Sequence, residues 1–160
     1  MTGRASTKPR ARPFIGVTPD EAIATSDVTR YELRRSYADA VLQGGGVPLV
    51  LPFTDDPGVL DDYLALVDGL LVTGGAFDVP PEMYGEVPRP GLGPVKLNRS
   101  KFEAALLERA LAADLAILGV CGGMQLLNVV CGGSLFQDID LEVTGSIGHQ
   151  QKTDSRKPAH

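Results

Sequence analysis

A cysteine set between glycines is the residue of this sequence best placed to do chemistry. Cys121 follows a short apolar and partly β-branched run, 115–120, and is bracketed by Gly119 and the glycine pair 122–123. Glycine allows the backbone to turn sharply at low steric cost. The apolar positions in 124–130 favour a helix packed back on the preceding strand. The pattern predicts a buried strand, a sharp elbow with the thiol at its tip, and a helix.

A thiol at such an elbow has the chemistry of a nucleophile. It faces the unpaired N–H groups and the positive end of the following helix, which favour a thiolate. The same N–H groups are suited to receive the oxyanion of a tetrahedral intermediate. The alternative is that Cys121 is an inert core residue, as most lone cysteines in apolar stretches are. Cys131 lies at the far end of the expected helix and has no basic residue nearby in sequence, so we interpret it as an inert core residue.

Composition and charge indicate the number of domains and argue against some kinds of partner. With 160 residues and 43% hydrophobic content, the chain is expected to form one domain with a core. A net charge of −5 argues against nucleic acid or an anionic membrane as a partner. No apolar run is long enough to cross a bilayer, and a reactive thiol suits a reducing cytoplasm. We expect residues 1–12 to be a disordered basic tail and 13–160 to be the domain.

Strands and helices are expected to alternate along the chain. A parallel sheet with helices on both faces follows from a β-α-β-α-β order, and ligands bind such sheets beyond the carboxyl ends of the strands. Cys121 and the pair Gly74 and Gly75 both lie at such ends, so we expect them to share a pocket. The expected strands are 14–18, 47–51, 69–73, 115–120 and 134–139, and the expected helices are 28–43, 58–67, 102–113 and 124–130.

The segment between the third strand and the next helix is rich in proline. Residues 76–98 contain five prolines, which predicts a rigid loop rather than a regular element. Asp78 lies close enough to the glycine pair to reach the same pocket, although most loop aspartates cap turns. Ser100 is expected to cap the next helix, with Glu103 completing a capping box. No regular element is expected after residue 139.

Several of these stretches resemble the class I glutamine amidotransferase-like hydrolases, and within them the γ-glutamyl-γ-aminobutyrate hydrolase group. GVCGGMQLLN at 119–128 resembles the nucleophile motif GxCxGxQLLN, and CGGSLFQDI at 131–139 is similar to the segment that follows it. SYADAVLQGGGVPLVLP at 36–52 and DGLLVTGGAFDVPPEMYGE at 68–86 resemble the first helix with the second strand, and the third strand with the oxyanion loop. The resemblance extends from residue 14 to about residue 150.

The resemblance implies a doubly wound, mostly parallel, flavodoxin-like sheet and a cysteine hydrolase that cleaves γ-glutamyl amides through a γ-glutamyl thioester. It implies no cofactor and no metal. Cys121 would be the nucleophile, and the N–H groups of Gly75 and Gly122 would bind the oxyanion. The residues implied in substrate binding are Gly74, Asp78, Gln125 and His149.

The resemblance also has gaps. The family's general base is a histidine well downstream, oriented by a nearby glutamate, and this sequence ends at His160 before that region. His149 and His160 resemble noncatalytic positions. Ser100 stands where many members have Asp, and Gly122 where many have Arg. The resemblance therefore implies that the C-terminal part of the fold is missing and that the chain is inactive alone.

Other interpretations remain open at this stage. The chain is alternatively a glutaminase domain that supplies ammonia to a synthetase partner, or a noncatalytic remnant that binds a γ-glutamyl ligand or a protein. An open sheet edge and apolar surface would favour pairing with a second copy or a complementing chain. The amine half of the substrate does not follow from the sequence.

Overall fold

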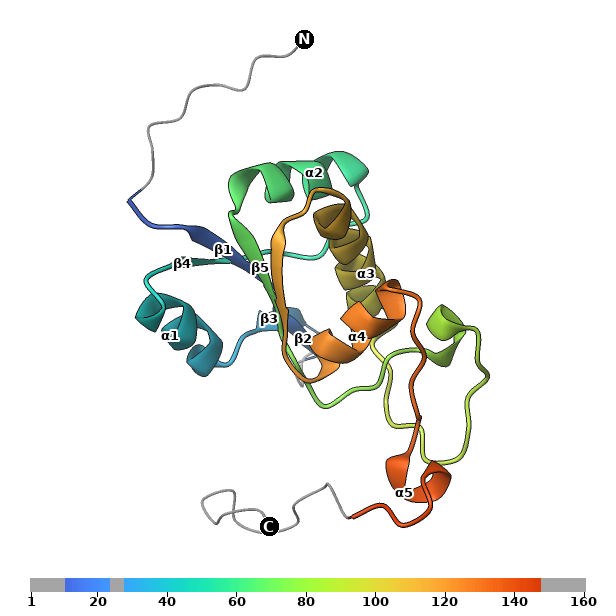
Figure 1. The fold of residues 1–160 in the computed structure, drawn as a ribbon. Coiled ribbons are helices and arrows are strands. Elements are labelled where there is room, and N and C mark those ends of the chain that lie inside the picture. The colour runs from blue at the N-terminus through green and yellow to red at the C-terminus, as the bar shows by residue number, and fades with distance from the viewer. Residues whose placement is uncertain (1–10, 24–27, 148–160) are drawn as a thin grey trace.

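The centre of the molecule is a parallel four-stranded sheet. A computed structural model describes residues 11–23 and 28–147. The strand order is β4-β1-β5-β6, and every neighbouring pair is parallel (Figure 1). The predicted α/β architecture is confirmed. The strands are β1 (Phe14–Val17), β4 (Val47–Val50), β5 (Gly69–Val72) and β6 (Ala116–Gly119).

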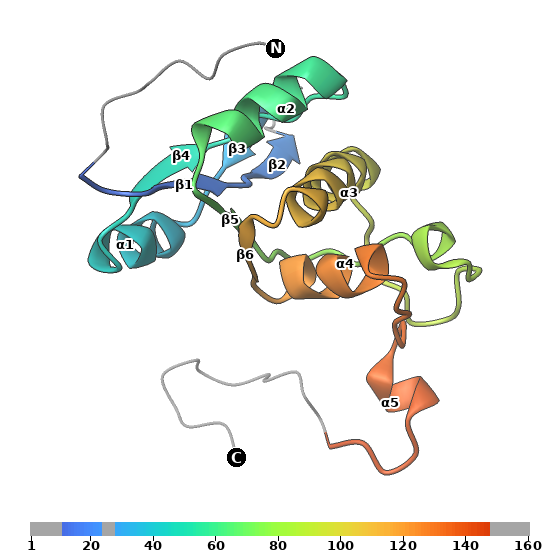
Figure 2. The ribbon, with the colours of Figure 1, turned by 45° about the horizontal axis from the view of Figure 1, so that its top comes forward.

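Helices cover both faces of this sheet, as predicted (Figure 2). Helix α1 (Arg35–Gln43) lies on one face. Helices α2 (Pro57–Leu66), α3 (Leu97–Ala112) and α4 (Gly122–Val130) lie on the other. Within the described part of the chain, no helix is both long and apolar enough to cross a membrane.

The core lies between the sheet and α3. One buried cluster joins Leu60 of α2 and Leu70 of β5 to Leu106 of α3, and a second joins Val72 of β5 to Leu126 of α4. All four residues of β5 are buried, as expected of a strand covered on both faces. The core therefore fixes the strand that leads into the glycine pair.

The first helix is shorter than predicted. Residues 29–32, expected to be helical, form β3 (Thr29–Glu32), which pairs antiparallel with β2 (Asp20–Ile23). The Tyr31 hydroxyl accepts a hydrogen bond from the Phe53 N–H at 3.0 Å, and the two rings lie 5.0 Å apart. These long-range contacts and the strand pairing override the helical spacing of the apolar residues.

Helix α3 begins earlier than predicted. Its N-cap is Lys96, and Ser100 lies within the first turn, where its N–H donates to the Lys96 carbonyl at 2.9 Å. The predicted capping box is therefore wrong. The Glu103 carboxylate instead turns into the interior and accepts a hydrogen bond from the Thr18 hydroxyl at 2.6 Å. A buried polar partner directly after β1 is more favourable for this carboxylate than a cap at the surface.

The predicted strand at 134–139 is also wrong. The Asn128 side-chain amide donates to the Ser134 carbonyl at 2.9 Å, and the chain continues into the short helix α5 (Ile139–Glu142). The Asp138 carboxylate caps this helix by accepting from the Leu141 N–H at 3.0 Å. Helix α5 also contradicts the expectation that no regular element follows residue 139. The segment 76–98 is largely irregular, as expected, apart from a single 3₁₀ turn, η1 (Pro81–Tyr84), and the start of α3.

The packing of α3 gives a stability prediction. Leu106 is fully buried in the first cluster, so Leu106→Ala should lower the free energy of unfolding by about 2–5 kcal/mol. The matched control is Leu111→Ala, because Leu111 lies on the same helix and is 43% exposed. It should cost less than about 1 kcal/mol. Urea unfolding measures both, and equal losses would contradict the packing described here.

Candidate active site

The elbow predicted around Cys121 is present. Strand β6 ends at Gly119 and helix α4 begins at Gly122. Cys121 has φ of 53° and ψ of −111°, a conformation that L-residues rarely adopt and that is held only when the surroundings impose it. Cys121 is exposed to solvent. The thiol is thus presented at the carboxyl end of the sheet, between a strand and a helix.

Close packing of α4 against the sheet imposes this conformation. A Cβ on Gly123 would lie 2.2 Å from the Val72 carbonyl oxygen, and a Cβ on Gly119 would lie 2.7 Å from the Met124 nitrogen. Only glycine permits these distances. The bracket of glycines therefore allows the first turn of α4 to sit directly on β5 and β6.

The glycine pair after β5 lies beside the cysteine. Strands β5 and β6 pair with Val72 opposite Gly119, so the two strands end side by side at the same edge of the sheet. A Cβ on Gly74 would lie 2.9 Å from the Cβ of Cys121. The Gly74 N–H donates to the Tyr37 hydroxyl of α1 at 3.0 Å. The structure thus brings Gly74 and Cys121 together, as the sequence led us to expect.

Two backbone N–H groups near the thiol are unpaired. Within the described residues, neither the Gly75 N–H nor the Gly122 N–H makes a hydrogen bond. Both glycines pack on the buried Phe77 ring: a Cβ on Gly75 would lie 2.6 Å from that ring and a Cβ on Gly122 3.3 Å from it. One donor lies in the loop after β5 and the other is the first residue of α4, and unpaired N–H groups of this kind can stabilise an oxyanion.

Gln125 and Asp78 line one cavity of about 380 Å³, next to the elbow. Gln125 lies one turn beyond the cysteine, and its N–H donates to the Cys121 carbonyl at 3.0 Å. One oxygen of the Asp78 carboxylate accepts from the Gly93 N–H at 2.6 Å, which ties the loop to itself. Asp78 therefore has a structural contact in addition to the binding role implied for it. His149 lies outside the described residues.

Behind the glycine pair lies a buried polar network that sequence reasoning missed. Arg99 has no exposed surface and donates to the Thr73 carbonyl at 2.6 Å and to the Glu103 carboxylate at 3.0 Å. Burial raises the pKa of Glu103, against the opposing effects of Arg99 and Thr18. The spacing of Arg99 and Glu103, four residues apart on one helix, was a signal in the sequence for an ion pair.

Asp20 joins this network at its outer side. Its carboxylate lies 3.1 Å from a guanidinium nitrogen of Arg99 and accepts from the Lys96 ammonium at 2.6 Å. Burial by itself would raise the pKa of Asp20, but the hydrogen bonds from Lys96 and the Glu21 N–H and the charge of Arg99 lower it below its ordinary value. Asp20 is therefore held as a carboxylate at neutral pH.

The second cysteine lies at the opposite end of α4 from Cys121. Cys131 is exposed at the C-terminal end of α4, so the interpretation of it as a core residue is wrong. Among the described residues, no group of histidine, cysteine and acidic side chains is arranged to hold a metal ion.

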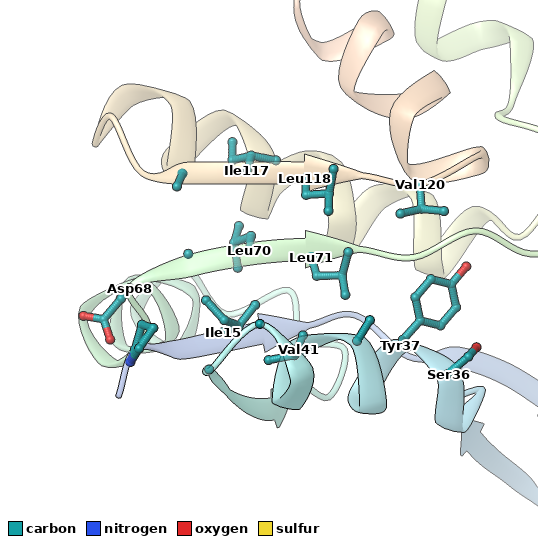
Figure 3. Close-up of a pocket in the computed structure, with 16 residues that line it drawn as sticks. Ile15, Ser36, Tyr37, Val41, Asp68, Leu70, Leu71, Ile117, Leu118 and Val120 are labelled. Atoms are coloured by element: carbon teal, nitrogen blue, oxygen red, sulfur yellow. The ribbon is translucent and has the colours of Figure 1, made fainter. Parts of the chain in front are cut away.

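An apolar groove of about 610 Å³ lies on the α1 face of the sheet (Figure 3). Ile15, Leu71 and Leu118 come from its strands, and Val41 lies across from them on α1. Leu118 is 62% exposed. The groove reaches Val120, the residue before the nucleophile candidate. In the described structure β6 pairs with β5 alone, so one edge of this sheet is open beside the groove.

Comparison with known proteins identifies a family and several relatives of this chain. The peptidase C26 family model matches residues 13–160. Protein NtpR of Enterococcus hirae is 38% identical over 143 residues, which cover 87% of this chain and 59% of NtpR. A putative glutamine amidotransferase-like protein of Rickettsia prowazekii is 38% identical over 135 residues, covering 81% of this chain and 47% of that protein.

A relative with a named substrate is also found. The γ-glutamyl-γ-aminobutyrate hydrolase PuuD of Escherichia coli is 32% identical over 129 residues, covering 79% of this chain and 49% of that enzyme. The chain spans about half the length of the curated relatives it matches. With a family model matched over most of its length, the chain belongs to the peptidase C26 family of class I glutamine amidotransferase-like proteins.

Proposed function

We propose that this chain carries the nucleophile of a hydrolase that cleaves γ-glutamyl amides. The observation that carries the proposal is the placement of an exposed thiol at a strained elbow, beside the unpaired N–H groups of Gly75 and Gly122. Strain at a non-glycine residue and unpaired N–H donors beside it are typical of a nucleophile and its oxyanion site. Membership of a hydrolase family supports the same chemistry.

The proposed reaction proceeds through a covalent intermediate. The Cys121 sulfur attacks the γ-carbonyl carbon, a C–S bond forms, and the carbonyl electron pair moves to oxygen. The N–H groups of Gly75 and Gly122 donate to this oxyanion. When the oxyanion collapses, the C–N bond breaks and the amine leaves with a proton. Water then hydrolyses the γ-glutamyl thioester to glutamate and restores the thiol.

Recognition of the glutamyl half is assigned to the cavity beside the elbow. Gln125 has a side-chain amide that makes no hydrogen bond within the described residues, and Asp78 lies in the same cavity. An amide and a carboxylate are suited to the α-carboxylate and α-ammonium groups of a glutamyl unit. Gly74 leaves room for the γ-carbonyl next to the sulfur. A contact of His149 with substrate remains a prediction.

The general base is proposed to come from a further segment. No histidine lies among the described residues, and the relatives are about twice the length that this chain matches. The apolar groove and the open edge of β6 lie next to the nucleophile and offer a surface for such a segment. We assign this surface to a polypeptide equivalent to the unmatched half of the relatives, which would bring the base to Cys121.

The identity of the nucleophile is tested by affinity labelling. A γ-glutamyl chloroketone should modify Cys121 in preference to Cys131, because the proposed oxyanion donors lie beside Cys121 and the cavity lined by Gln125 is one helical turn from it. Intact mass and peptide mapping after incubation measure the site. Cys131→Ser should label as the unaltered chain does and Cys121→Ser should not. Equal labelling of both thiols would count against the proposal.

The need for an outside base is tested by a burst experiment. A γ-glutamyl 4-nitrophenyl ester has a leaving group that requires no protonation, so the 160-residue chain should release about one equivalent of 4-nitrophenolate and then stop. The accumulated thioester is detected by mass. Sustained turnover that is lost in Cys121→Ser would contradict this prediction. If His149→Asn then abolished turnover, the base would lie within this chain.

The names of two relatives favour a second candidate. The Rickettsia protein is named a putative glutamine amidotransferase-like protein, and a Mycobacterium tuberculosis protein, 33% identical over 156 residues, is named a putative glutamine amidotransferase. This chain would then hydrolyse glutamine to supply ammonia to a synthetase. Activity on free glutamine that appears only with a partner enzyme would favour this role over γ-glutamyl amide hydrolysis.

A further inference from the structure

The buried guanidinium of Arg99 is directed at the loop that carries the oxyanion donor. One of its terminal nitrogens, Nη2, donates to the Thr73 carbonyl at 2.6 Å and the Thr73 hydroxyl at 2.9 Å, and it reaches the Gly74 carbonyl at 3.4 Å. These two carbonyls are consecutive, and they are the last before Gly75. A single side chain on α3 thus holds the backbone immediately behind the proposed oxyanion site.

The planarity of the peptide bond gives this contact a consequence. The carbonyl oxygen and the N–H of one trans peptide point in opposite directions. Because the Gly74 carbonyl is turned toward Arg99, the N–H of Gly75 in the same peptide is directed away from it. The Gly74 N–H is fixed in turn by the Tyr37 hydroxyl at 3.0 Å. The Thr73–Gly74 peptide is therefore held at both its carbonyl and its N–H, and the next peptide, which supplies the proposed donor, is held at its carbonyl by Arg99.

The guanidinium is itself held in place by other buried groups. Its Nε donates to one oxygen of Glu103, and the same oxygen accepts from the Thr18 hydroxyl. Its Cζ atom lies 4.4 Å from the centre of the Phe77 ring. Nη1 of Arg99 and the second oxygen of Glu103 make no hydrogen bond within the described residues. Nη1 lies 3.1 Å from the Asp20 carboxylate as an ion pair, so of these two atoms only the Glu103 oxygen has no partner among the described residues.

We propose that Arg99 is a positioning residue for the oxyanion site, acting through the Gly74–Gly75 peptide and touching no substrate atom. This inference rests on the proposed function. Lysine cannot replace arginine in the role, because an ammonium lacks the planar fork that reaches Thr73, Gly74 and Glu103 together. An arginine that merely stabilised α3 would affect all reactions of Cys121 alike, whereas a positioning residue affects those that form an oxyanion.

The test compares two reactions of the same thiol in a Cys131→Ser background. With a γ-glutamyl 4-nitrophenyl ester, the Cys121 thiol loses its proton to buffer and its sulfur bonds to the carbonyl carbon. The C–O bond then breaks and 4-nitrophenolate leaves with the electron pair. This step passes through an oxyanion. Iodoacetamide alkylates the same sulfur by direct displacement of iodide, with no oxyanion.

Arg99→Lys should slow acylation about 10-fold to 100-fold, less than the full loss of an oxyanion donor, and change alkylation by less than about 3-fold. The matched control is Arg109→Lys on the same helix, where Arg109 pairs with the exposed Asp61. It should change neither rate. Equal falls in both rates of Arg99→Lys, or no fall in acylation, would overturn the proposal.

A second variant decides the question if Arg99→Lys does not fold. Thr73→Val keeps the shape of the side chain but removes the hydroxyl that accepts from Arg99. It should slow acylation by about 3-fold to 10-fold, a part of the full effect, and leave alkylation unchanged. If the unaltered chain is alkylated but never acylated, the proposed function fails and this inference with it. If the unaltered chain is acylated and both variants are acylated at the same rate as it is, only this inference fails and the proposed function stands.

Discussion

The structure depends on the parallel pairing of β5 with β6. This pairing ends both strands at the same level and places the loop after β5 against the elbow after β6. The contact is close enough that a Cβ on Gly74 would lie 2.9 Å from the Cβ of Cys121, and a Cβ on Gly123 would lie 2.2 Å from the Val72 oxygen. Without glycine at these positions, the thiol and the two unpaired N–H groups would not share one site.

The remaining parts of the fold serve to hold those two strand ends. Helix α3 buries Leu106 and Leu107 against the sheet and directs Arg99 toward the Thr73 carbonyl. Helix α1 contributes the Tyr37 hydroxyl from the opposite face. Apolar burial thus supplies the stability of the region, and the buried polar contacts supply the orientation of a single loop.

The local parts of the site were predictable from sequence. A strand, a glycine-bracketed cysteine and a helix are contiguous in the chain, so the elbow at Cys121 follows from backbone requirements alone. The order of the elements predicts the parallel sheet, and the sheet brings the glycine pair to the same edge. Each of these steps requires only short-range patterns and one general rule about α/β sheets.

The parts that sequence did not predict depend on contacts between distant residues. From sequence, Tyr37 is one more apolar position of a helix, but in the structure its hydroxyl accepts from the Gly74 N–H. Phe77 is one more loop residue in the sequence, but in the structure Gly75 and Gly122 pack on its ring. Glu103 was assigned to a surface cap because Ser100 precedes it by three residues, yet it pairs with Thr18, 85 residues away. Residues 29–32 became a strand for the same reason, a tertiary contact at Tyr31.

The central claim is that this chain presents a thiol to an oxyanion site made by two backbone N–H groups. It is tested most directly by the crystal structure of the chain after reaction with a γ-glutamyl chloroketone. The account predicts a bond to the Cys121 sulfur, with the ketone-derived oxygen about 2.7–3.1 Å from the nitrogens of Gly75 and Gly122. An adduct whose oxygen points into solvent, away from both glycines, would contradict it.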